Sequence, residues 1–346
     1  MSEGITLPAD QLTALAAGIF EKAGMSPNHA RTVAEVLVWA DLRGAASHGV
    51  QRIGRYLEII DAGEMNVRPD IRIEKDLPGA VLIEGDRGPG QVTMTLAAKE
   101  AARKAKTGGI GLAVVRHTTH TGALGYYTRL AALDGVIALA GSASWPNMAY
   151  HGTAEVGIAT NPFSIAAPRG NAEPIVLDMA TGVVALGKIV HAARTGKSIP
   201  DTWALDENGK PTTDPKRAAL PLALGGPKGA GLSLMIEFIA SLLVGNPILV
   251  DTLEGKPNAK AHRQNAFLIA INVASFGVPA DFIASLERTV ADLKALPRQD
   301  GFDEILMPGE RGARELDARK RTGITIPAAT WKEVSAVAAR FGVPLP

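Results

Sequence analysis

The sequence predicts an α/β fold in which a strand-rich middle is flanked by helical segments at both chain ends. Apolar residues recur every three to four positions through the first 61 residues, which is the spacing of amphipathic helices. Between residue 80 and about residue 273, short apolar runs alternate with helical stretches, as in βαβ units. Helical spacing returns from about Pro279. We therefore expect a largely parallel sheet packed between helices.

Three helices are expected near the N-terminus. The first ends at Gly24, and Ser26 followed by Pro27 has the residue types of a helix N-cap and a first helical position. The second helix ends at Gly44, and the third is expected over Ser47–Asp61.

The middle and the tail follow in order. The expected strands cover Ala80–Ile83, Ile110–Val115, Val136–Ala140, Phe163–Ala167, Ile175–Asp178 and Phe267–Val273. The helices between them cover about 91–106, Ala123–Leu133, a segment starting near Met179, and about Gly229–Leu243. Two helices are expected in the tail, with a charged linker at Met307–Glu315. We expect residues 1–75 and 279–346 to form one helical domain and residues 76–278 an α/β domain.

Charge and composition exclude several classes of protein. The 36 Lys and Arg residues and 35 Asp and Glu residues leave a net charge of +1, which argues against nucleic acid and anionic membranes as partners. The chain has no Cys, so disulfides, thiolate metal sites and a Cys nucleophile are excluded. No uncharged apolar run reaches about 18 residues, and the first ten residues do not resemble a secretory signal. We therefore expect a cytoplasmic protein.

The segment SHGVQRIGRY, which runs from Ser47 to Tyr56, combines an imidazole with guanidinium groups. On a helix, His48, Arg52 and Arg55 share one face. Arg can clamp a carboxylate through two parallel hydrogen bonds, and His, with a pKa of about 6.5, can exchange the proton of an adjacent hydroxyl. These groups suit a 2-hydroxy or 2-keto acid. The same spacing also fits a solvated helix face with Ser47 as its N-cap.

A second histidine-bearing segment, RHTTHTGALGYY at Arg116–Tyr127, follows a strand and opens a helix. Ligands of α/β sheets bind beyond the carboxyl ends of strands, so this loop is well placed for a site. Metal ligation by His117 and His120 is disfavoured, because no carboxylate lies at a supporting spacing. Either histidine then has a catalytic, cofactor-contacting or structural role.

Nucleotide-binding fingerprints are absent. The turn GDRGPGQ at Gly85–Gln91 lacks the G-x-G-x-x-G order, and Arg116 stands where the following strand would need an acidic residue. We interpret it as an ordinary turn. The segment RTGKS has His191 in place of the first glycine of a P-loop, and no G-x-S-x-G elbow occurs.

Two further segments have residue types that suit a cofactor. GGPKGAG at Gly225–Gly231 precedes an apolar helix, where backbone N–H groups and Lys228 would attract an anion. A flexible entry loop is the alternative. Asp178, in the segment LDMAT, either accepts hydrogen bonds from ribose hydroxyls or caps the helix expected after it.

Six ordered motifs together resemble one family. The motifs RGAASHGVQR, HTTHTGALGYY, TNPFSIAAP, LDMAT, SIPDTWALDENGKPTTDP and GGPKG resemble the malate/L-lactate dehydrogenase-like family of NAD(P)-dependent oxidoreductases, over about Leu7–Gly312. The resemblance implies a three-layer, non-Rossmann cofactor domain and a mainly helical domain for substrate binding and dimerisation. It also implies a homodimer whose cleft holds NAD or NADP, of which we favour NAD.

The resemblance, closest in wording to ureidoglycolate dehydrogenases, also implies site residues. His48 and His120 are the candidate proton acceptors, with Ser47 orienting His48. Arg52 and Tyr56 are expected to bind the substrate. No metal ligand is implied. The implied cofactor contacts are His120, Thr121, Gly122, Ala123, Leu124, Ser144, Asp178, Met179, Ala180, Lys228, Gly309, Glu310 and Arg311.

The expected reaction is hydride transfer between nicotinamide and a 2-hydroxy acid of the malate, lactate, sulfolactate or ureidoglycolate type. Reduction of cyclic imines is an alternative within the family, but the relatives that perform it have aspartate where this chain has Lys188. A second departure is Ala159, where the family usually has glycine. A catalytically silent ligand-binding protein is the alternative from another class, and the presence of His48, Arg52 and His120 disfavours it.

Overall fold

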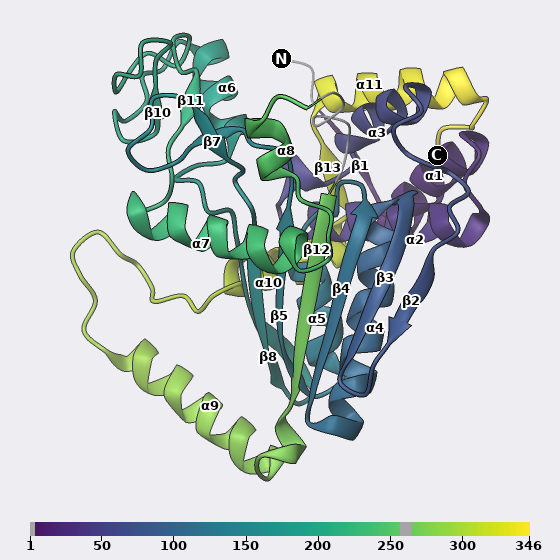
Figure 1. Ribbon diagram of the computed structural model, residues 1–346, viewed down its shortest axis with the longest axis vertical. Helices are drawn as coiled ribbons and strands as arrows, with labels where there is room; N and C mark the ends of the chain where they lie inside the picture. The colour runs from purple at the N-terminus through teal and green to yellow at the C-terminus, as the bar shows by residue number, and fades with distance from the viewer. Residues whose placement is uncertain (1–3, 257–263) are drawn as a thin grey trace.

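A seven-stranded sheet forms the centre of the molecule (Figure 1). The computed structural model describes residues 4–256 and 264–346. The strands lie in the order β2-β3-β4-β12-β5-β8-β9. Their bounds are β2 Arg72–Asp76, β3 Ala80–Gly88, β4 Ile110–Thr118, β5 Val136–Ala143, β8 Phe163–Arg169, β9 Ala172–Met179 and β12 Gln264–Asn272. All six strands expected from the sequence are present, and β2 was not expected.

The expectation of a largely parallel sheet is wrong. Only β3 and β4 pair in parallel, and every other neighbouring pair in this sheet is antiparallel. The reason is that β12 enters between β4 and β5 in the opposite direction, while β8 and β9 form a hairpin. Strands β3, β4, β5 and β9 nevertheless point the same way, so the loops that follow them gather at one edge of the sheet.

Helices cover both faces of this sheet, so the expected three layers are confirmed. Helices α4 (Gly90–Gly108) and α5 (Gly125–Leu133) pack on one face, behind the sheet in Figure 1. Helix α7 (Pro227–Glu237) and the π-helix η2 (Phe238–Leu242) cover the other face. Helix α4 packs closely on β4 at Gly111, because a Cβ at Gly111 would overlap the carbonyl oxygen of Ala101 in the helix.

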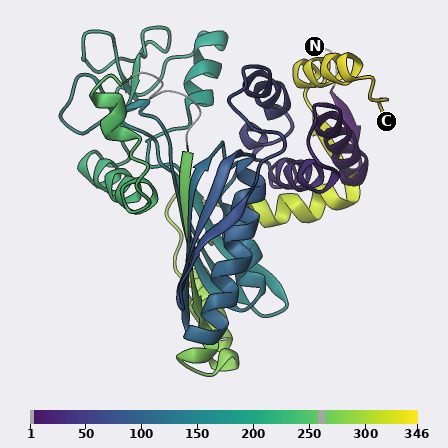
Figure 2. The same cartoon turned by 45° about the vertical axis from the view of Figure 1, so that its right-hand side comes forward.

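The two chain ends share one hydrophobic core beside the sheet (Figure 2). The N-terminal segment comprises β1 (Ile5–Leu7), α1 (Ala9–Lys22), α2 (Pro27–Leu42), the 3₁₀ turn η1 (Ala46–His48) and α3 (Arg52–Asp61). The C-terminal segment comprises α10 (Glu310–Thr322), β13 (Ile324–Ile326) and α11 (Ala328–Phe341), and β13 pairs with β1. Ser26 caps α2 by accepting the His29 N–H, as the sequence predicts.

Shorter elements complete the chain. They are β6 (Met148–Ala149) paired with β7 (Val156–Ile158), β10 (Ala204–Leu205) paired with β11 (Leu220–Pro221), α6 (Leu186–Thr195), α8 (Leu249–Leu253), η3 (Val273–Ser275) and α9 (Pro279–Ala295). Helix α9 contacts β8 and projects from the far end of the sheet (Figure 1). Within residues 4–256 and 264–346, no helix is both long and apolar enough to cross a bilayer.

Two expected element boundaries are wrong. The helix expected near Met179 begins only at Leu186, because β9 continues through Met179 in register with β8. The tail carries three helices, and α10 begins at Glu310 inside the segment interpreted as a linker. The charged residues of that segment form ion pairs on the helix surface, such as the pair between Arg314 and Glu310.

Candidate active site

A tight turn, rather than a continuous helix, presents His48. The sequence predicts one helix over Ser47–Asp61, but the chain forms η1 and then starts α3 at Arg52. The carboxylate of Asp41 in α2 fixes this break by accepting the Val50 N–H at 2.8 Å. Gly49 is needed here, because a Cβ at this position would overlap the Asp41 carboxylate. Burial raises the pKa of Asp41 to about 7.

The turn brings Ser47, His48 and Arg52 together. Ser47 Oγ lies 3.0 Å from His48 Nδ1, and Arg52 Nε donates to the Ser47 carbonyl oxygen at 2.6 Å. Among the described residues, no carboxylate pairs with the Arg52 guanidinium. Arg55, expected on the same face, instead pairs with Glu58 on the exposed side of α3.

His120 joins this group from the loop after β4. Its ring lies 5.8 Å from the His48 ring, measured between centroids, and the two planes are tilted by 25°. Its Nδ1 lies 2.7 Å from the hydroxyl of Tyr56 and 3.3 Å from the Gly122 backbone nitrogen. Tyr56 is 1% exposed, so its hydroxyl reaches the site only through His120.

Burial and the Arg52 charge keep both imidazoles neutral. Burial, followed by the charge of Arg52, lowers the pKa of His48 to about 4. Burial also lowers the pKa of His120 well below its usual value, with smaller effects from His48 and Arg52. Near neutral pH the site therefore holds two uncharged rings beside one fixed positive charge. This is an arrangement that favours an anionic ligand with an exchangeable proton.

His117 does not belong to this group. Its Nδ1 lies 3.0 Å from both carboxylate oxygens of Glu84, and its backbone has a φ of +51°. Arg116 binds the same carboxylate through Nε at 3.0 Å. His117 and Arg116 thus tie the end of β4 to β3. Within the described chain, no group of three His, Asp or Glu side chains is arranged to hold a metal ion.

The candidate cofactor residues lie along the sheet edge where β4, β5 and β9 end. Asp178 Oδ2 accepts the Gly125 N–H at 2.8 Å, so Asp178 caps α5 and not a helix of its own segment. Burial of the carboxyl group raises the pKa of Asp178 to about 6, against the opposing effects of the Gly125 N–H and the Arg43 charge. The residue as a whole is exposed. Ser144 follows β5, and its backbone N–H donates to Asn161 Oδ1 at 3.2 Å.

The remaining residues of this set sit nearby. Thr121, Gly122, Ala123 and Leu124 are buried between His120 and α5. Met179 and Ala180 are half-buried at the end of β9.

Lys228 extends this edge from the start of α7. Gly225 and Gly226, with φ of +58° and +61°, turn the chain into the helix and leave Lys228 exposed. The Leu224 N–H donates to the Thr181 carbonyl oxygen at 2.8 Å, which places this turn beside the end of β9. The Thr181 hydroxyl is buried and has no hydrogen-bond partner.

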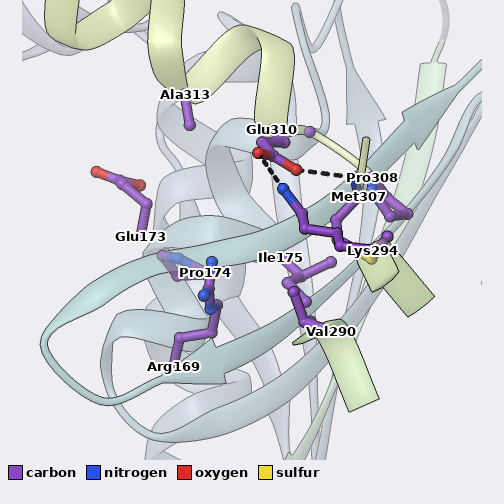
Figure 3. Close-up of a pocket in the computed structure, with 11 residues that line it drawn as sticks. Arg169, Glu173, Pro174, Ile175, Val290, Lys294, Met307, Pro308, Glu310 and Ala313 are labelled. Atoms are coloured by element: carbon purple, nitrogen blue, oxygen red, sulfur yellow. Dashed lines mark hydrogen bonds and ion pairs between the residues drawn. The ribbon is translucent and has the colours of Figure 1, made fainter. Parts of the chain in front are cut away.

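Gly309 and Glu310 border a cavity of about 130 Å³ between β9, α9 and the start of α10 (Figure 3). The Glu310 carboxylate accepts from Lys294 at 2.5 Å and from the Met307 N–H at 2.9 Å. These donors and Arg314 lower the pKa of Glu310 to about 2 against the opposing effect of burial. Arg311 is exposed on the first turn of α10.

Arg43 connects this cavity with the histidines. Its guanidinium donates to the Gly309 carbonyl oxygen at 2.8 Å, and its charge acts on Asp178. Asp178 in turn accepts the N–H of Gly125, which follows the loop that holds His120, so Arg43 and Asp178 link the cavity to that loop.

Sequence reasoning missed four residues of this region: Asp41, Arg43, Gln91 and Thr181. Gln91 belongs to the glycine-rich turn interpreted as ordinary, and its Nε2 donates to the Tyr56 hydroxyl at 2.8 Å. Its position at the start of a helix after three glycines was the available signal. Asp41 precedes the RGAASHG motif and Arg43 begins it, but only the folded protein reveals their partners.

Known proteins with similar sequences and folds are dehydrogenases. Residues 7–335 match the family model described as malate/L-lactate dehydrogenase. Malate dehydrogenase of Pyrococcus horikoshii is 36% identical, over 98% of this chain and 96% of that protein. Ureidoglycolate dehydrogenase (NAD(+)) of Escherichia coli is 37% identical, over 84% and 83%. The crystal structure of malate dehydrogenase from Entamoeba histolytica superposes with a TM-score of 0.93 at 30% identity, covering 99% of this chain and 100% of that one. The chain therefore belongs to the malate/L-lactate dehydrogenase family.

Proposed function

We propose that this chain is a cytoplasmic NAD-dependent dehydrogenase that interconverts small 2-hydroxy acids and 2-keto acids. The observation that carries the proposal is the Arg52 guanidinium, which no described carboxylate neutralises, beside the neutral rings of His48 and His120. A substrate carboxylate supplies the missing negative charge. The adjacent hydroxyl then lies close to a group that can take its proton.

Each polar residue of the site has a distinct task in this reaction. Arg52 binds the carboxylate and so fixes C2 of the substrate. His48 or His120 exchanges the proton of the C2 oxygen, and Ser47 orients the His48 ring through Nδ1. When bound, the nicotinamide ring accepts or donates the hydride.

The cofactor fits the sheet edge described above. Asp178, an exposed residue, offers an acceptor for ribose hydroxyls, and the exposed Lys228 at a helix N-terminus offers a cation for phosphate. The buried Thr181 hydroxyl, which has no partner, offers a further polar group. An acidic side chain at this place favours NAD over NADP, because it repels a 2′-phosphate. The residues that would hold NAD are those of the implied set: His120–Leu124, Ser144, Asp178–Ala180, Lys228 and Gly309–Arg311.

We also propose that the chain works as a homodimer with two domains. Residues 1–75 and 279–346 would bind substrate and form the dimer, and residues 76–278 would bind the cofactor. The core shared by both chain ends supports this division. Two segments of the first set lie at the sheet: residues 72–75 belong to its edge strand β2, and α9 contacts β8.

A substrate panel tests the proposal. The purified protein is incubated with NAD or NADP and with malate, lactate, sulfolactate or ureidoglycolate, and reduced nicotinamide is followed by absorbance. We expect turnover of at least one 2-hydroxy acid, with NAD preferred. Turnover of a cyclic imine with reduced cofactor, but of no 2-keto acid, would identify an imine reductase instead. Cofactor binding without any turnover would identify a silent binding protein.

A further inference from the structure

A chain of three polar side chains runs from the protein interior to His120. Gln91, at the start of α4, donates from Nε2 to the Tyr56 hydroxyl at 2.8 Å. The Tyr56 hydroxyl lies 2.7 Å from His120 Nδ1. Gln91 and Tyr56 are 0% and 1% exposed, so water does not compete for these hydrogen bonds. The three residues come from three separate elements and meet only in the folded protein.

The direction of each hydrogen bond follows from one backbone group. The Gly122 N–H can only donate, and it points at His120 Nδ1 at 3.3 Å. Nδ1 must therefore offer a lone pair, so the Tyr56 hydroxyl donates its proton to Nδ1. The Tyr56 oxygen is then free to accept from Gln91 Nε2, while Gln91 Oε1 is buried without a hydrogen-bond partner. In the neutral ring, the single proton resides on Nε2.

The geometry points to Gln91 and Tyr56 as positioning residues that hold His120 as an Nε2–H hydrogen-bond donor, which leaves His48 as the base. This inference rests on the proposed dehydrogenase function and chooses between its two histidines. An Nε2 that already carries a proton cannot accept another. His120 instead donates to the C2 oxygen and stabilises it as negative charge develops.

The proton balance of the oxidation is then complete. The C2–H bond breaks and its electron pair leaves as hydride to the nicotinamide. The O–H bond breaks and its proton passes to His48 Nε2, while the C2–O double bond forms. The proton on His48 Nδ1 is held by the Ser47 hydroxyl oxygen at 3.0 Å. His120 keeps its own proton throughout.

The tautomer of His120 can be measured directly in the unaltered protein. Nitrogen-15 NMR of histidine-labelled protein, with and without NAD, distinguishes protonated from unprotonated ring nitrogens, and His120→Gln identifies the His120 signals. We expect a protonated Nε2 and an unprotonated Nδ1. A proton on Nδ1 would overturn the inference, whereas an absence of turnover on the substrate panel would overturn only the proposed function.

A substitution that reverses the direction of these hydrogen bonds tests the role of Gln91. Gln91→Glu replaces the donor by an acceptor, so Tyr56 would donate to the new carboxylate. Its oxygen would then accept a hydrogen bond from His120 Nδ1, and the ring proton would move from Nε2 to Nδ1. We expect the nitrogen-15 signals of His120 to show a protonated Nδ1 and an unprotonated Nε2, the reverse of the parent protein. We also expect kcat/KM to fall at least tenfold, with the Kd of NAD unchanged. Gln11→Glu, which places the same charge on the exposed side of α1, is the matched control. A folded Gln91→Glu protein with unchanged signals and kcat/KM would contradict the assignment.

Tyr56→Phe is the second variant, and it keeps the inference testable if the Gln91→Glu protein does not fold. It removes one oxygen and breaks the chain without adding a charge. We expect the Nδ1 signal to shift and kcat to fall about tenfold while KM and the Kd of NAD hardly change. A Tyr56→Phe protein with the parent's Nδ1 signal and kcat would contradict the proposed role.

Discussion

Arg52 holds its guanidinium beside Ser47 and His48 because Nε is already bound to the Ser47 carbonyl oxygen. The two terminal nitrogens are thereby set to meet a carboxylate in a bidentate arrangement. Lysine would keep the charge but lose both the fork and the bond to Ser47. We expect Arg52→Lys to lower kcat/KM for the 2-hydroxy acid about 30- to 100-fold, the equivalent of about 2–3 kcal/mol.

Arg55→Lys is the matched control for this measurement. Arg55 lies one turn along the same helix, where it pairs with Glu58 on the exposed side. We expect its kcat/KM to stay within twofold of the parent value. Near-normal kcat/KM in the Arg52→Lys protein would show that Arg52 does not clamp the substrate.

The charge of Arg52 also contributes, after burial, to the pH dependence of the reaction. His48 takes a proton only when its ring is neutral, and its pKa in the free protein is lowered to about 4 by burial and by Arg52. A bound carboxylate neutralises Arg52, so the pKa of His48 should rise in the complex. Activity should therefore decline below about pH 4 in kcat/KM, which reports the free protein, and at a higher pH in kcat.

Rate profiles for oxidation between pH 3.5 and 8 check this expectation. Arg52→Gln should raise the pKa of His48 in the free protein, so the declines of kcat/KM and of kcat should occur at more similar pH values. A decline of kcat/KM centred near pH 6.5 in the parent protein would mean that His48 is not the titrating group.

At the scale of elements, the break between η1 and α3 places His48 off the helix axis. The break depends on Gly49, where a Cβ would overlap the Asp41 carboxylate that holds the Val50 N–H. Gly49→Ala should push the turn away from α2. We expect a loss of about 2 kcal/mol or more in the free energy of unfolding, together with a lower kcat, measured by chemical denaturation and steady-state kinetics.

Gly54→Ala provides the comparison within the same segment. Gly54 lies inside α3, and a Cβ there would meet no atom within 4 Å. Replacement of a helical glycine by alanine should stabilise the protein by up to about 1 kcal/mol and leave kcat unchanged. Equal destabilisation by the two substitutions would mean that the Asp41 contact is not what Gly49 preserves.

The sequence predicts the existence of most elements and says little about how they pair. Apolar runs identify β3, β4, β5, β8, β9 and β12, because burial selects the same residues in either strand direction. Direction depends on where the chain returns, and nothing local marks the entry of β12 between β4 and β5. The helix expected through Ser47 fails for a similar reason, because the Asp41 carboxylate competes for the Val50 N–H only after α2 has packed.

The candidate site is predictable to the same extent. The motifs contain His48, Arg52 and His120, and the residue types alone indicate proton exchange and carboxylate binding. Gln91 does not, because a glutamine at a helix start has no characteristic partner until Tyr56 and His120 fold against it. The motif also assigns Tyr56 to the substrate, whereas its hydroxyl is occupied by two protein partners.

At the scale of the whole molecule, large apolar side chains remain exposed around α9. They include Phe276 (71% exposed), Val278 (60%), Leu296 (55%) and Phe302 (63%). These side chains flank the two ends of α9, and exposed apolar side chains of this size are typical of a protein interface. We expect the chain to sediment at twice its 36.1 kDa mass, and Phe276→Asp combined with Phe302→Asp to shift it toward the monomer.

Leu345→Asp, at the other end of the molecule, is the control for added charge on an exposed leucine. We expect it to leave the sedimentation coefficient unchanged. A parent protein that sediments as a monomer at micromolar concentration would exclude a stable dimer.

The pairing of β1 with β13 has a consequence for synthesis on the ribosome. Ile5 lies opposite Ile326, so the first strand gains its partner only after nearly the whole chain has emerged. All seven strands of the central sheet are available by residue 272. We therefore expect the nascent sheet to form early and the core shared by the N-terminal and C-terminal segments, which needs β13, to be completed after it.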